Sequence, residues 1–203
     1  MMNHALTLTR LLRASLLALV LGLVACGQDT LKFSAIDITG ADYGREFSLA
    51  DQNGRTRGLA DFQGKVVMMF FGYTQCPDVC PTALTEMAQI KSLLGKDGAR
   101  FQGIFVTVDP ERDRPETLKA YMANFDPSFL ALVPQVAELP ALMKSFKIFF
   151  KKVEGPTPSS YTMDHTAGSY IYDTQGKLRL FTRNGADVAQ TVADIRLLLK
   201  QNP

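Results

Sequence analysis

The sequence predicts an α/β domain in which helices cover both faces of a mixed β-sheet. Two continuous apolar runs, 65–72 and 101–108, have the length and character of central strands that are buried on both faces. Each run is followed by a segment in which apolar residues recur at helical spacing. Two short strand-like segments flank the turn Asp173-Thr174-Gln175-Gly176, which predicts a hairpin near the C-terminus.

The remaining elements follow in order along the chain. Further strands are expected at 32–39, 46–49, 168–173 and 177–182. Helices are expected at 81–94, 115–125, 136–146 and 187–200. Pro140 fits the third of these helices only within its first turn. A turn is expected at 52–55 and a loop at 155–160. A strand, a cysteine motif, a helix, a strand, a helix, a hairpin and a final helix form the order of a thioredoxin-like fold.

The first 25 residues have the layout of an export signal. Arg10 and Arg13 precede a largely apolar run, 14–25, which is too short to cross a bilayer. A small residue before Cys26 resembles the cleavage site of bacterial lipoproteins, in which that cysteine becomes lipidated. An ordinary signal or an uncleaved anchor is the alternative. The expected organisation is a signal peptide at 1–25, a tether at 26–31 and the folded domain at 32–203, facing an oxidising, periplasmic space.

Charge gives no reason to expect a nucleic-acid partner. The whole chain has 22 Lys and Arg against 20 Asp and Glu, and two of the arginines belong to the signal. Without them the chain is formally neutral, and it has no basic run with interleaved aromatic residues.

Three side chains are the candidate metal ligands. The chain has three Cys and two His, of which Cys26 and His4 lie in or at the edge of the signal. Cys76, Cys80 and His165 remain. Two thiolates and one imidazole suit copper, because thiolates select Cu(I) and imidazole suits both oxidation states. Structural zinc sites almost always have four protein ligands, whereas a catalytic zinc could use three and a water molecule, so zinc remains an alternative. Three ligands also leave a metal accessible for transfer to a partner.

The cysteines lie where a buried strand gives way to a helix. Cys76 follows the run 65–72, and Cys80 enters the first helical turn, so both sulfurs are expected on one side of the loop. A helix N-terminus also favours thiolate over thiol. A plain local disulfide is the alternative, although so short a loop gains little stability from one. His165 precedes the strand expected at 168–173, and in a thioredoxin-like topology that segment passes beside the cysteine loop.

Two acidic residues are candidates for supporting roles. Asp109 ends the second apolar run, where it is either a turn or helix-cap residue or an acid beside the metal loop that orients a neighbour or docks a partner. Asp164 precedes His165 and either orients the imidazole or caps a turn.

Three motifs, in this order, resemble those of the Sco/SenC family of copper-binding proteins: CPDVCP after an apolar strand, VTVDPERDRPETLKAY, and YTMDH before a strand. The resemblance covers roughly residues 30 to 200. It implies a thioredoxin-like fold with extra N-terminal strands and a hairpin insertion. It also implies a membrane-tethered domain that binds one Cu(I) or Cu(II) through Cys76, Cys80 and His165.

The resemblance implies a role in assembling cytochrome c oxidase. The protein would deliver copper to the binuclear centre of subunit II, or keep the cysteines of that centre reduced, and another periplasmic copper carrier is a further expected partner. Asp109 matches the Asp of the family's VDP motif. Gln75 and the segment 131–134 depart from the family pattern, at positions where contacts with a partner could differ.

Two other functions remain open. The first is a thiol–disulfide oxidoreductase or peroxidase-like enzyme on the same fold, since a dithiol at a helix start is suited to disulfide exchange. The Cys-x-x-x-Cys spacing differs from the Cys-x-x-Cys usual for such reductases, and no proline adjoins Asp164-His165. The second is a lipid-anchored binding module in which Cys76 and Cys80 only staple a loop. A copper carrier that is not an enzyme is the favoured function.

Overall fold

The computed structural model describes residues 32–157 and 160–201. The signal peptide, the tether and the lipidated Cys26 expected from the sequence lie outside these residues. Within the described part of the chain, no helix is both long and apolar enough to span a membrane.

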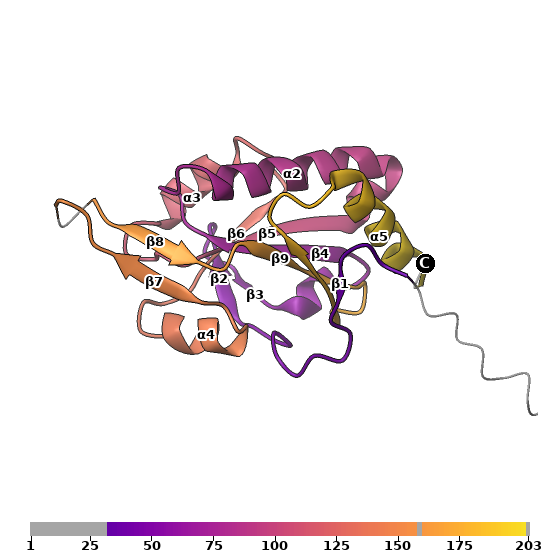
Figure 1. Ribbon diagram of the computed structural model, residues 1–203, viewed down its shortest axis with the longest axis horizontal. Coiled ribbons are helices and arrows are strands. Elements are labelled where there is room, and N and C mark those ends of the chain that lie inside the picture. Colours follow the sequence, from indigo (N-terminus) through magenta and orange to yellow (C-terminus); the bar gives the residue numbers. More distant parts are fainter. Residues whose placement is uncertain (1–31, 158–159, 202–203) are drawn as a thin grey trace, which may run out of the picture. The chain divides into compact units, whose positions relative to one another are not determined.

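An eight-stranded mixed sheet forms the centre of the fold (Figure 1). In spatial order its strands are β1 Ile36–Asp37, β10 Leu178–Arg183, β9 Gly168–Tyr172, β4 Val66–Gly72, β5 Phe101–Thr107, β6 Leu130–Val133, β2 Leu49–Asp51 and β3 Thr56–Arg57. Strands β4, β5 and β6 run parallel to one another, whereas the other neighbours pair antiparallel. The expected mixed sheet is confirmed, and β1, β2 and β3 are its extra N-terminal strands.

The two apolar runs form the central strands because they can be buried on both faces. All seven residues of β4 and all seven of β5 are buried. The strands pair in register from Val66 with Phe101 to Gly72 with Thr107. Their carboxyl ends therefore meet at one edge of the sheet, and the loops that follow them lie side by side there.

Helices cover both faces of this sheet (Figure 1). They are α2 Val79–Leu94, α3 Pro115–Met122, α4 Leu139–Ser145 and α5 Val188–Gln201, with short 3₁₀ segments at Leu59–Phe62 and Gly95–Arg100. Adjacent residues of β4 contact opposite layers, as strand alternation requires. The Phe71 ring lies 5.1 Å from that of Phe146, at the end of α4, whereas the Phe70 ring packs on Phe105 beneath α3.

A second, two-stranded sheet was not assigned from the residue pattern. It pairs β7 Phe150–Val153 with β8 Thr162–His165 and is inserted between α4 and β9. His165 is therefore the last residue of a strand, and not part of a loop that enters β9. The β7 strand escaped assignment because most of its residues are exposed and two are lysines. The hairpin insertion implied by the family resemblance is this β7–β8 hairpin.

Several other details differ from the expected elements. The strands expected at 32–39 and 46–49 are Ile36–Asp37 and Leu49–Asp51 in the structure. Strands β3 and β6 have no expected counterpart, and α4 begins at Leu139 rather than at Val136. The later start places Pro140 within the first turn of α4, where a missing backbone N–H costs nothing. The expected position of this proline is confirmed.

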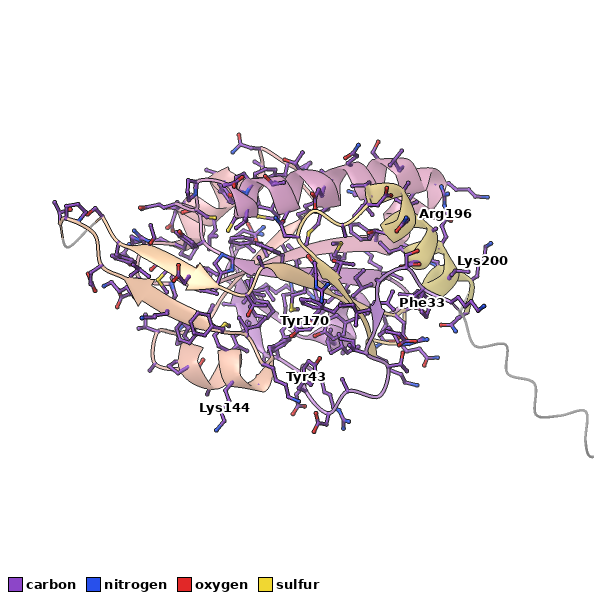
Figure 2. All side chains as sticks on the ribbon, viewed as in Figure 1. Phe33, Tyr43, Lys144, Tyr170, Arg196 and Lys200 are labelled. Atoms are coloured by element: carbon purple, nitrogen blue, oxygen red, sulfur yellow. The ribbon has the colours of Figure 1, made fainter. Side chains whose placement is uncertain are left out.

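The N-terminal end of the described chain is fastened to the last helix. Asp194, on α5, is 2% exposed, and its carboxylate accepts hydrogen bonds from the backbone N–H groups of Ser34 and Ala35 at 2.8–3.1 Å. Phe33 lies beside the same helix (Figure 2), and the guanidinium of Arg179 is 5.9 Å from its ring. A buried carboxylate thus holds the segment that leads into β1.

We expect Asp194→Ala to release this segment. The substitution removes the charged acceptor of two partly buried hydrogen bonds, so the free energy of unfolding should fall by about 1–3 kcal/mol. Amide hydrogen exchange at residues 34–37 should accelerate. Denaturant unfolding and exchange with peptide-level mass spectrometry test both points, with the exposed Gln190→Ala on the same helix as control. Unchanged exchange at 34–37 would contradict the assignment.

Candidate metal centre

The three predicted ligands converge in the folded protein. Cys76 lies in the loop between β4 and α2, Cys80 is the second residue of α2, and His165 ends β8. Nε2 of His165 is 3.5 Å from Sγ of Cys80, and the three ligand atoms all lie within 4.8 Å of one another. Cys80 is 0% exposed and Cys76 is 9% exposed, whereas His165 is half-buried and is the most exposed of the three. This cluster could hold one metal ion.

The cysteine loop is held in place by a carboxylate that sequence reasoning missed. Asp113, in the loop after β5, is fully buried. It accepts hydrogen bonds from the backbone N–H and hydroxyl of Thr74 and from the hydroxyl of Thr107. Burial raises the pKa of Asp113, against the effect of these hydrogen bonds. The ends of β4 and β5 are thereby tied together immediately before Cys76.

Gly72 brings β4 into close contact with the second cysteine. A Cβ added at Gly72 would lie 2.8 Å from Sγ of Cys80 and 2.8 Å from the ring of Phe105. Only a residue without a side chain leaves room for the sulfur at this point. A glycine that ends an otherwise apolar strand was the available signal in the sequence.

The environment of His165 selects which ring nitrogen can bind a metal. Nδ1 lies 3.1 Å from the backbone carbonyl oxygen of Thr166. Because a carbonyl only accepts, this bond places the ring proton on Nδ1 and leaves the lone pair of Nε2 directed at Cys80. The rings of Phe70 and Tyr73 meet the imidazole edge to face, with centroids 5.9 and 6.0 Å away. The imidazole of His165 is thus oriented by a backbone carbonyl and by two aromatic rings.

The two thiols have opposite electrostatic environments. A hydrogen bond from Cys80 lowers the pKa of Cys76 to about 4, against the effect of burial and with a further contribution from His165. The hydrogen bond to Cys76, together with burial, raises the pKa of Cys80. Near neutral pH the reduced pair therefore shares one proton and carries one negative charge. Metal binding as two thiolates releases that proton.

Asp109 and Asp164 do not contact the ligand atoms. Asp109 is 3% exposed, and its carboxylate binds the guanidinium of Arg112 and the hydroxyl of Tyr161, which donates at 2.7 Å. Direct docking of a partner does not fit a carboxylate so enclosed, whereas orientation of a neighbour does. Asp164 is exposed and precedes His165 on β8, so its side chain points away from the imidazole. Nδ1 of His165 donates its hydrogen bond to the backbone carbonyl of Thr166 instead.

Arg112 and Tyr161 are further residues that sequence reasoning did not single out. Both lie inside motifs that were noticed, VTVDPERDRP and YTMDH. An arginine among three acids of one short segment, Asp109, Glu111 and Asp113, was the signal available for the first. Nothing in the pattern around Tyr161 distinguished it from a core aromatic residue.

We expect Gly72→Ala to damage the metal site more than the fold. The added methyl group would displace Sγ of Cys80, so copper affinity should fall by about tenfold or more. Gly103→Ala on the adjacent strand β5 is a matched control, since its Cβ would meet the Phe129 ring at 2.8 Å and no ligand. Both variants should lose about 1–3 kcal/mol of unfolding free energy. Equal copper affinities in the two variants would contradict the expectation.

We expect Cys76 to be alkylated selectively in the reduced, metal-free protein. Its thiolate should persist down to about pH 4 and be lost as pH falls below that value. Pulses of iodoacetamide between pH 3 and 9, followed by peptide mass spectrometry, measure the midpoint for each cysteine, with glutathione as an ordinary thiol control. Buried Cys80 should stay unlabelled. A midpoint near 8.5 for Cys76, as in a free thiol, would refute the assignment.

Comparison with known proteins identifies the family. The SCO1/SenC family model matches residues 37–200. The SCO2-like protein of Rickettsia felis is 36% identical over 135 residues, which cover 66% of this chain and 66% of that relative. The chain thus matches just under two thirds of the length of this curated relative.

Solved structures resemble the fold over most of the chain. Bradyrhizobium japonicum ScoI, determined with copper bound, is 39% identical, with a TM-score of 0.70 over 78% of this chain and 99% of ScoI. BsSco, reported with a disulfide switch and as a member of the Sco family of cytochrome c oxidase assembly proteins, is 22% identical. Its TM-score of 0.63, over 82% of this chain and 98% of BsSco, shows a shared fold alone. These matches confirm the thioredoxin-like α/β class, and the chain belongs to the SCO1/SenC family.

Proposed function

We propose that this protein is a copper carrier that binds one copper ion through Cys76, Cys80 and His165. The observation that carries the proposal is the convergence of two sulfurs and one imidazole nitrogen within 4.8 Å. Thiolates select Cu(I), and the imidazole of His165 extends the site to Cu(II). The copper bound by ScoI, a relative of 39% identity, supports the same cargo here.

The geometry suits transfer better than storage. A site of three protein ligands leaves copper open to attack by a fourth ligand from another protein. Cys76 and His165 are less deeply buried than Cys80, so an incoming thiolate can approach from their side while Cys80 still holds the ion. The copper ion is then passed through a shared intermediate without becoming free in solution.

The partner we propose is the assembling cytochrome c oxidase, with subunit II as the copper acceptor and another periplasmic copper carrier as the donor. Membership of the SCO1/SenC family supports this proposal, as does the description of BsSco as a member of a family of oxidase assembly proteins. Export, and a lipid anchor at Cys26, would place the site on the side of the membrane where such partners meet. Metabolic labelling with a fatty-acid analogue, lost in Cys26→Ala, tests the anchor.

A second candidate function is reduction of a disulfide in an exported partner. It is favoured by the neighbouring thiols and by the lowered pKa of Cys76, which supplies the attacking thiolate. Cys76 would attack one partner sulfur and release the other as a thiol, and Cys80 would then resolve the mixed disulfide. Two thiols of this protein are oxidised to a disulfide while one partner disulfide is reduced to two thiols. The same residues can serve both functions.

Copper titration tests the carrier function. Reduced protein spanning residues 27–203 should bind one equivalent of copper. His165→Ala should lower the affinity by more than about 100-fold, because even loss of a group behind a ligand typically costs 10–100-fold. Thr162→Ala, an exposed position on the same strand, is the control.

The titration would contradict the carrier function if His165→Ala bound copper as tightly as the unmodified protein. That result would remove His165 from the site and favour the dithiol function. Unchanged stoichiometry in Cys76→Ala would exclude Cys76 as a ligand in the same way.

A further inference from the structure

Arg112 joins three segments that surround the candidate metal site. It lies in the loop between β5 and α3, and its side chain is 13% exposed. One guanidinium nitrogen, Nη1, donates to Oε1 of Gln75 at 3.0 Å and to the backbone carbonyl of Tyr161 at 2.8 Å. Nε binds the carboxylate of Asp109 in its own loop. Gln75 directly precedes Cys76, and Tyr161 directly precedes the strand that carries His165.

Aromatic contacts fix the plane of this guanidinium. Its central carbon lies 3.5 Å from the centroid of the Tyr161 ring and 5.7 Å from that of Tyr73. The Tyr161 hydroxyl donates to Asp109, which closes the network on itself. Such stacked and hydrogen-bonded arginines are held in one orientation, unlike a flexible surface cation.

The position of the contacts matters because the ligands come from separate sheets. Cys76 and Cys80 follow β4 of the eight-stranded sheet, whereas His165 belongs to the two-stranded sheet of β7 and β8. Among the described strands, no ladder of backbone hydrogen bonds joins these two sheets. Only residues 166 and 167 join His165 to β9, which pairs with β4. The distance from the sulfurs to the imidazole therefore depends on this short connection and on side chains that reach from one segment to the other.

We propose that Arg112 is a positioning residue that sets the convergence of His165 with the two cysteines. This inference rests on the proposed copper site. Arg112 does not touch the ligand atoms; it acts by holding Gln75 and Tyr161, the residues that lead into the two ligand-bearing segments. Its charge is matched by Asp109, so its effect on the site comes from geometry rather than from a net positive potential.

Lysine and a neighbouring arginine provide matched controls. Arg112→Lys keeps the charge but replaces the planar fork with a single ammonium, which cannot hold all three partners in the same geometry. Arg114 is exposed and its side chain takes no part in the network, so Arg114→Ala removes the same residue type from the same loop. Arg112→Lys thus separates the effect of the positive charge from the proposed role. Arg114→Ala separates the effect of any change in this loop from it.

A double-mutant cycle with His165 tests the inference. Copper affinity, by competition with a chromophoric chelator, and the thiolate-to-Cu(II) charge-transfer absorption are measured for the unmodified protein, Arg112→Ala, His165→Ala and the double variant. We expect Arg112→Ala to lower affinity about 10–100-fold and to shift the absorption band. In the His165→Ala background the same change should alter affinity less than about twofold. The copper affinity of Arg112→Lys should lie between those of Arg112→Ala and the unmodified protein. The copper affinity of Arg114→Ala should equal that of the unmodified protein.

The outcomes separate this inference from the function on which it rests. Equal losses of affinity in both backgrounds would overturn it, since Arg112 would then act on the whole fold and not through His165. Unaltered affinity and absorption in Arg112→Ala would also overturn it, while leaving the copper site intact. No copper binding by the unmodified protein would overturn the proposed function itself. Thermal unfolding of the metal-free protein shows whether Arg112→Ala folds. If it does not, the same cycle is measured with Arg112→Lys, and its effects on affinity in the two backgrounds are compared in the same way.

Discussion

The hydrogen bonds of Asp113 are the interaction on which the candidate site depends. Parallel pairing of β4 and β5 brings two loops to one edge of the sheet, but pairing alone does not shape them. The fully buried carboxylate binds Thr74 on one side and Thr107 on the other. Loss of this acceptor would leave several donors buried without a partner, at a cost of about 1–3 kcal/mol each. The cysteine loop is thus built on a rigid support before any metal arrives.

The imidazole side of the site has a different kind of support. His165 sits on a small hairpin whose backbone pairs only within itself among the described strands, and it reaches the sulfurs through side-chain contacts. The hydrogen bond from its Nδ1 to the carbonyl of Thr166 leaves the Nε2 lone pair available to bind a metal ion. The proton shared by Cys76 and Cys80 leaves when metal binds. The two cysteines and the imidazole are thus held by different parts of the fold.

Much of this arrangement could be predicted from the sequence, and the limits have physical causes. Apolar runs identified β4 and β5 because a strand that is buried on both faces needs apolar side chains at nearly every position. Cys76, Cys80 and His165 stood out by their chemistry. The strand Phe150–Val153 did not, because its side chains are largely exposed and carry no alternating pattern. The supports Arg112 and Asp113 are polar loop residues, and their burial depends on contacts with distant segments that no local pattern reveals.

The attachment of Ser34 and Ala35 to Asp194 determines how this domain can be held. In Figures 1 and 2, Phe33 and the C-terminal end of α5 lie at one end of the domain's long axis, and the β7–β8 hairpin lies at the other. β1 is three strands away from β4 in the sheet order, whereas α5 packs against both β4 and α2. Arg196 of α5 donates to the backbone carbonyl of Leu93 on α2 at 2.9 Å, so force applied at residues 34 and 35 would reach the helix that carries Cys80 through α5.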